Sequence, residues 1–203
     1  MRTSRPTRTF DFQGLLLSLE HGNPETVLAS PEAGVIPFVL ANIRHRLDRP
    51  LIVVVPDAER ARAVVDAMAA FEAEQWPALQ PVLPYFANDV SPYHEIAPIR
   101  ALAADRVAAA YRVSMDLGVA AVVLPADALL LRTLDAATLD ASAAMASAGA
   151  NLDRVELAEQ LIAGGYDRVP VVEDPGTFCI RGGVVDIWSP LYDRPVRLDF
   201  FGD

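Results

Sequence analysis

Short apolar runs alternate with segments of helical periodicity along the first two thirds of the chain. This alternation is typical of a parallel α/β sheet, in which helices connect buried strands. Asp57 stands where a helix cap belongs, because its carboxylate can accept hydrogen bonds from the free amides of a first turn. The pattern predicts a β-α-β-α-β-α-β series, with strands at residues 27–29, 51–55, 82–83 and 119–124 and helices at residues 35–46, 57–71 and 99–115.

The last third of the chain is dominated by strand signals. Residues 184–188 are mostly apolar and are bounded by Gly182-Gly183 and by Pro190. A second strand pattern follows at residues 196–201. Two such runs separated by turn residues predict a hairpin.

Composition changes near residue 134. Residues 134–149 are rich in Ala, Ser, Thr and Asp, and they lead into a predicted short helix at residues 157–163. Asp153 begins a capping box before this helix, and Gly164-Gly165 suits a C-terminal cap after it. We place a domain boundary here, which gives an α/β domain at residues 1–134 and a smaller α+β domain at residues 135–203.

Two arginines interrupt the C-terminal strand pattern. Arg168 and Arg181 are separated by at least one turn, so an antiparallel return of the chain would bring them onto one surface. The planar fork of arginine suits bidentate recognition of a carboxylate on a partner. The alternative is pairing within the chain, and four nearby acids could serve: Asp167, Glu173, Asp174 and Asp186.

Composition excludes several kinds of chemistry. The chain has 203 residues, 52% of them hydrophobic, which is enough for one sizeable core, and no apolar run approaches the ~20 residues that a membrane span needs. All 17 basic residues are arginines, so a Schiff base and a phosphate loop with its lysine are both excluded. Cys179 is the only cysteine and the three histidines are scattered, so neither a disulfide nor a metal site is expected.

The negative charge is concentrated in the second predicted domain. The chain carries a formal net charge of -10, and residues 135–203 hold 5 arginines against 12 acids. An acidic module repels phosphate backbones, so we expect a protein partner rather than nucleic acid.

The segment after the first predicted strand has the position of a phosphate loop without its chemistry. Ser30, Glu32 and Gly34 lie where glycine amides, a lysine and a hydroxyl would hold phosphates. Glu32 places a negative charge there, and Gly34 is the one glycine left. We interpret these residues as a degenerate phosphate loop and expect no ATP binding by this segment alone.

Residues 84–98 form a predicted loop rich in proline and aromatic residues. The simplest interpretation is a surface loop pinned to the sheet by its rings, which are Tyr85, Phe86 and Tyr93.

In this order, the motifs resemble the N-terminal region of the bacterial transcription-repair coupling factor family (Mfd), which is itself similar to the excision-repair protein UvrB. The resemblance covers residues 12–203. It is carried by Leu83-Pro84-Tyr85, Ser91-Pro92, Arg100, Gly164-Gly165-Tyr166, Arg181-Gly182, Val185-Asp186-Ile187 and Arg197-Leu198-Asp199-Phe200-Phe201. UvrB would need an intact phosphate loop and a longer tyrosine-rich hairpin after the third strand, so the coupling-factor family fits better.

The resemblance implies a degenerate RecA/helicase-like domain followed by a UvrA-binding domain. It implies that Arg168 and Arg181 contact UvrA and that Phe178 lies beside them as an apolar contact. Cysteine stands at position 179, where UvrB has a further arginine, so that third contact is not carried over. It implies no catalytic residue and no cofactor here, in a cytoplasmic protein without membrane contact.

The family's motor, an ATP-dependent DNA translocase, and its contacts with RNA polymerase and DNA belong to domains that lie further along. The resemblance therefore implies that the chain is the N-terminal part of a longer protein. It makes the chain a non-catalytic module that recruits UvrA to lesion-stalled RNA polymerase. Two alternatives are a nucleotide-binding enzyme domain with an atypical phosphate loop and a DNA-binding module that uses residues 85–94.

Overall fold

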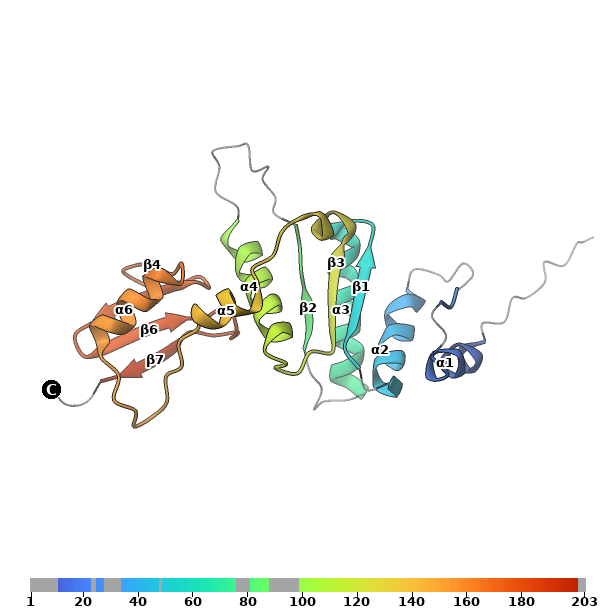
Figure 1. Ribbon diagram of the computed structural model, residues 1–203, viewed down its shortest axis with the longest axis horizontal. Helices are drawn as coiled ribbons and strands as arrows, with labels where there is room; N and C mark the ends of the chain where they lie inside the picture. The colour runs from blue at the N-terminus through green and yellow to red at the C-terminus, as the bar shows by residue number, and fades with distance from the viewer. Residues whose placement is uncertain are drawn as a thin grey trace, which may run out of the picture.

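The computed structural model describes residues 11–22, 25–27, 34–47, 49–75, 81–87 and 99–200, apart from the side chains of residues 72–75. In these residues the chain forms two sheets, each with its own helices (Figure 1). A three-stranded sheet occupies the middle of the molecule, and a four-stranded sheet lies toward the C-terminal end.

The first sheet is parallel, in the order β1-β3-β2. Its strands are β1 (Leu51–Val55), β2 (Val82–Pro84) and β3 (Ala121–Pro125). Helix α3 (Ala58–Gln75) follows β1 and covers one face, where Val64 and Met68 are almost fully buried in one core with strand residues. Parallel order with a connecting helix confirms the α/β pattern of the first domain.

Three strands and three helices of this domain confirm their predictions. Helices α2 (Val35–Leu47), α3 and α4 (Arg100–Ser114) begin and end within a few residues of the expected bounds. The oxygen Oδ1 of Asp57 accepts from the Arg60 amide at 2.8 Å, as expected of a cap. Of the predicted strand at residues 27–29, only Val27 is described, and it is exposed and belongs to no strand.

The first helix, α1 (Phe12–Glu20), was not predicted. The carboxylate of Asp11 caps it by accepting from the Gly14 amide at 2.8 Å. Its leucines, Leu15 and Leu16, form a small second core with Val39 of α2. The helix is therefore held mainly by packing against α2, and Leu51 at the start of β1 packs against the same core.

The start of the aromatic loop is anchored as expected. Phe86 is buried, and the Arg62 guanidinium lies 4.7 Å from the centre of its ring. The Arg106 guanidinium lies 4.5 Å from the centre of the Tyr85 ring and donates to the Phe86 carbonyl at 2.7 Å. These contacts pin the end of β2 to α3 and α4. Tyr93 lies outside the described residues.

A 3₁₀ helix, η1 (Ala126–Leu130), and a short helix, α5 (Ala136–Ala141), connect the two sheets. The predicted boundary near residue 134 falls between them. Since α5 packs against α4, the exact extents of the two domains, 1–134 and 135–203, stay a prediction.

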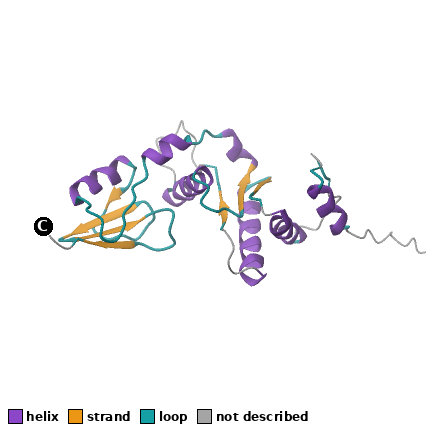
Figure 2. Ribbon diagram, turned by 60° about the horizontal axis from the view of Figure 1, so that its bottom comes forward, coloured by secondary structure: helices purple, strands orange, loops and turns teal. Residues whose placement is uncertain are grey.

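The second sheet is mixed, in the order β4-β5-β6-β7. Its strands are β4 (Asp167–Arg168), β5 (Thr177–Arg181), β6 (Val184–Trp188) and β7 (Val196–Asp199). The β6–β7 hairpin confirms the predicted one, and β5 pairs antiparallel with β6 as well. Figure 2 shows helix α6 (Arg154–Ala163) lying along one face of this sheet.

The caps of α6 confirm the sequence signal. One oxygen of Asp153 accepts from the amides of Val155 and Glu156, at 2.7 and 2.9 Å. The helix ends at Gly164, and Gly165 adopts a φ of 85°, a value that favours glycine. The helix buries Leu157 and Leu161 against the sheet.

The fold is thus mixed α/β, with one parallel and one mixed sheet, as predicted at that level. The finer likeness to a RecA or helicase domain stays a prediction. In the described part of the chain, no helix is both long and apolar enough to cross a membrane.

Candidate protein-binding site

The two candidate arginines belong to the second sheet, Arg168 to its edge strand β4 and Arg181 to the end of β5. Arg168 pairs with Phe178 in a parallel ladder, whereas Arg181 is the last residue of β5 and pairs with Val184. Paired residues share a face of a sheet and successive residues alternate. Arg168 therefore lies on the face that α6 covers, together with Phe178, and Arg181 lies on the opposite face. The expected antiparallel return is wrong, because β4 runs parallel to β5, and the register places the two arginines on opposite faces.

Arg181 is held by an ion pair within the chain. Its Nη2 lies 3.2 Å from Oδ2 of Asp186, and the Arg197 guanidinium binds the same carboxylate through Nε at 2.7 Å and Nη2 at 3.0 Å. Hydrogen bonds from Arg197 first, and then from Arg181, lower the pKa of Asp186. Of the four acids considered as partners, Asp186 is the one that Arg181 contacts. The Arg181 side chain is still 59% exposed, so much of its guanidinium faces solvent.

Arg168 is exposed and differs from Arg181 in its surroundings. Among the residues that the structure describes, no carboxylate oxygen lies within 4 Å of its guanidinium nitrogens. The side chain borders a shallow hollow on the α6 face, together with Arg154, Val155 and Ile180. Its hydrogen-bonding donors are therefore available to a partner.

Phe178, predicted as an apolar contact beside the arginines, is fully buried. It packs under α6 with Leu157, Leu161 and Val185. Its side chain therefore contributes to the core and not to the exposed surface, which corrects the prediction for this residue.

Cys179 faces the side of the sheet opposite Phe178 and is also buried. Its thiol donates to the Pro170 carbonyl at 3.1 Å, under the segment that connects β4 to β5. The position at which UvrB has another arginine is thus covered by the chain itself here. A third arginine contact has no exposed counterpart at this residue.

The residues of the degenerate phosphate loop are described only in part. Ser30 and Glu32 lie outside the described residues. Gly34 is exposed one residue before α2, and a Cβ built on it would meet no atom within 4 Å. No close approach of the backbone requires a glycine there. Among the described residues, no group of three or more histidine, cysteine or acidic side chains is placed to hold a metal ion.

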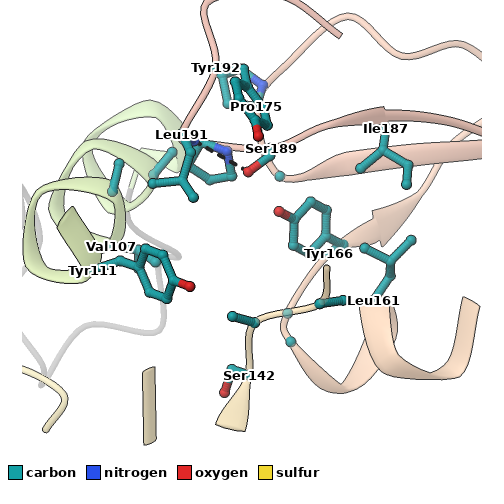
Figure 3. Close-up of a pocket in the computed structure, with 18 of the residues that line it drawn as sticks. Val107, Tyr111, Ser142, Leu161, Tyr166, Pro175, Ile187, Ser189, Leu191 and Tyr192 are labelled. Carbon is teal, nitrogen blue, oxygen red and sulfur yellow. Dashed lines mark hydrogen bonds between the residues drawn. The ribbon is translucent and has the colours of Figure 1, made fainter. Parts of the chain in front are cut away.

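Sequence reasoning missed a cavity of about 560 Å³ between the two sheets. Figure 3 shows Val107 and Tyr111 of α4 facing Tyr166 and Leu161 across it, with Ser142 below. Its walls are mostly apolar and come from α4, the segment around α5, α6 and the end of β6. The signal was weak because these residues are far apart in the sequence and share no motif.

Polar contacts at the rim of this cavity join α4 to the second sheet and its loops. Arg100, the first residue of α4, forms an ion pair with Asp167 of β4 and reaches the Gly176 carbonyl at 3.4 Å. Arg112, near the other end of α4, donates to the Leu191 carbonyl at 2.9 Å. Asp167, the residue next to Arg168, is therefore tied to α4.

Known proteins resemble both parts of the chain. Residues 146–203 match the UvrB interaction domain family. Over 166 residues, which are 81% of this chain, the sequence is 40% identical to the transcription-repair-coupling factor of Myxococcus xanthus and 27% identical to that of Escherichia coli. Over 57 residues, 28% of this chain and 9% of the relative, it is 44% identical to UvrABC system protein B of Thermotoga neapolitana. The chain spans only 14% of the length of the Myxococcus and Escherichia relatives.

Proposed function

Because the chain belongs to the UvrB-like part of the transcription-repair-coupling factor family, we propose that it is a non-catalytic module that docks the excision-repair protein UvrA. In this proposal residues 135–203 bind UvrA, and binding brings UvrA to RNA polymerase stalled at a lesion in the cytoplasm. ATP hydrolysis and contacts with RNA polymerase and DNA are assigned to the remaining length of the family's proteins. The chain itself needs no cofactor for docking.

The observation that carries the proposal is the pair of exposed arginines within the UvrB interaction domain. Arg168 has no acidic partner among the described residues, and Arg181 is more than half exposed beside Asp186. Guanidinium groups that keep free donors at a protein surface are suited to carboxylates of a partner. The acidic charge of residues 135–203 favours a protein over nucleic acid.

Calorimetric titration with the UvrA encoded in the same genome tests the proposal. We expect the wild-type chain to bind and the Arg168→Ala and Arg181→Ala variants to bind about 30-fold more weakly, the loss of an arginine that anchors an interface. Arg194→Ala is the matched control, since Arg194 is an exposed arginine of the same domain in the β6–β7 connection. A wild-type chain that does not bind UvrA would refute the function. Unchanged binding by both variants would refute only the roles of the two arginines.

The two alternatives have their own measurements. Heat of ATP binding that is abolished by changes around Gly34 would support a nucleotide-binding domain. A salt-sensitive gel shift with the isolated chain would support a DNA-binding module. In the described part of the chain we find no observation that favours either over docking.

A further inference from the structure

We propose that the UvrA docking surface extends from Arg168 onto the first turn of α6, where Arg154 and Val155 contact an acidic, partly apolar patch of the partner. This inference rests on the proposed function and adds two residues to it. Both residues lie inside the capping box that begins at Asp153, and their side chains take no part in capping.

The first step is geometric. Arg154 and Val155 lie in the first turn of α6, and they line the same shallow hollow as Arg168 of β4, together with Ile180 of β5. The hollow lies on the α6 face of the sheet, which is also the face that carries Arg168. A partner that reaches the Arg168 guanidinium from this side therefore meets the start of α6.

The second step concerns the position of the Arg154 guanidinium. Its Nη1 donates to the carbonyl of Gly182, in the turn between β5 and β6. This contact fixes the side chain over the end of the sheet and uses one of the five N–H donors of the guanidinium. The rest of the fork is oriented in advance, so less conformational entropy is lost when it binds a carboxylate.

The third step is the distribution of charge. Residues 135–203 contain five arginines, and three of them, Arg154, Arg168 and Arg181, surround the β5–β6 turn. Of the acids beside them, Asp153 caps α6, Asp167 pairs with Arg100, and Asp186 pairs with Arg181 and Arg197. Among the described residues, neither Arg154 nor Arg168 has a carboxylate oxygen within 4 Å of its guanidinium nitrogens. Complementary charge on the partner requires carboxylates.

The fourth step is the apolar residue among these arginines. Val155 is 63% exposed, although it stands beside the half-buried Ile180 in the hollow. Interfaces commonly place an apolar contact among charged groups that exclude water around it. We therefore expect the acidic patch of UvrA to include a small apolar side chain that covers Val155.

The test measures UvrA binding by calorimetry with the whole chain and three variants of the hollow, which are Arg154→Ala, Val155→Asp and Val155→Ser. We expect about tenfold weaker binding for Arg154→Ala and for Val155→Asp, and a smaller loss for Val155→Ser, which removes the apolar contact without adding a charge. Ile162→Asp is the matched control, because Ile162 is an exposed residue of α6 that does not line the hollow. We expect it to bind within twofold of the wild type.

The outcomes separate this inference from the proposed function. If the wild-type chain binds UvrA and the Arg154 and Val155 variants bind equally well, the extension is wrong and the docking function stands. If the wild-type chain does not bind, the function itself fails. Thermal melting followed by circular dichroism shows whether each variant is folded, and the exposed Val155 variants keep the test decisive if loss of the Arg154 contact with Gly182 unfolds the turn.

Discussion

Replacing Phe178 separates a role in the core from a role in binding. The family resemblance places this residue beside the UvrA contacts, whereas the structure buries it completely under α6. Phe178→Ala would weaken UvrA binding on either view, because it would destabilise the domain in one case and remove a contact in the other. Phe178→Leu distinguishes the two, since it keeps part of the apolar volume.

The expected loss of stability follows from burial. Truncating a fully buried phenylalanine to alanine lowers the free energy of unfolding by about 3–5 kcal/mol, because apolar contacts are lost and a cavity remains. Phe178 packs against Leu157, Leu161 and Val185, which are all buried, so the surroundings have little room to collapse. In a domain of this size such a loss lowers the melting temperature by more than about 12 °C. For Phe178→Leu we expect a loss of about 1–2 kcal/mol.

Urea unfolding followed by the fluorescence of Trp188, in a background with Trp76→Phe, measures this loss. Trp188 is suitable because it lies on β6, in the same sheet as Phe178. At a temperature where Phe178→Leu is folded, we expect it to bind UvrA as the wild type does. A Phe178→Leu variant of wild-type stability that binds UvrA more than tenfold more weakly would refute the assignment of Phe178 to the core.

Three further predictions concern charge pairs and the loop before α2. Hydrogen bonds from Arg197, and after it from Arg181, lower the pKa of Asp186 below 3.8. The charged carboxylate therefore stabilises the fold above about pH 4, and this contribution is lost as the pH falls through the lower folded-state pKa. In urea unfolding between pH 2 and 7, the free energy of unfolding should fall less at low pH for Asp186→Asn than for the wild type. A double-mutant cycle of unfolding free energies between Arg100→Ala and Asp167→Ala should give a coupling energy below about 1 kcal/mol, because both side chains are substantially exposed. A coupling energy of several kcal/mol would contradict the expectation of a weak ion pair. Gly34→Ala should leave the urea midpoint unchanged, since a Cβ meets no neighbour there. It should also leave the heat of an ATP titration unchanged, because we expect no ATP binding by this segment. A variant that loses an ATP signal seen with the wild type would support the nucleotide-binding alternative.

The elements that were predicted well have strong local signals. Strand β1 is a run of five aliphatic residues, and Asp57 marks the start of the helix that follows it. The capping box at Asp153 and the glycines after α6 fix that helix in the same way. Helix α1 had a comparable signal, with Asp11 as its cap and leucines at helical spacing, and it could have been found from the sequence.

The direction of β4 could not have been predicted in this way. Strand β4 has two residues, too few to show a periodic pattern, and the short connection at residues 169–176 would ordinarily return the chain antiparallel. Tertiary contacts hold the unusual course of this connection. The thiol of Cys179 donates to the Pro170 carbonyl, the Thr177 hydroxyl donates to the Asp174 carbonyl at 2.6 Å, and Gly176 adopts a φ of 78°.

This local geometry decides what the two arginines can do together. A flat partner cannot cover both faces of a sheet, so UvrA can contact Arg168 and Arg181 at once only by surrounding the β4 edge or the end of the sheet at the β5–β6 turn. Arg154 already reaches that turn from α6, and Arg181 is the residue directly before it. Arg154 thus approaches the turn from the α6 side, whereas the Arg181 guanidinium binds Asp186 on the other face. The sequence separation of the arginines identified the right pair of residues, but the parallel register of β4 shows that they would bind from two sides of one edge.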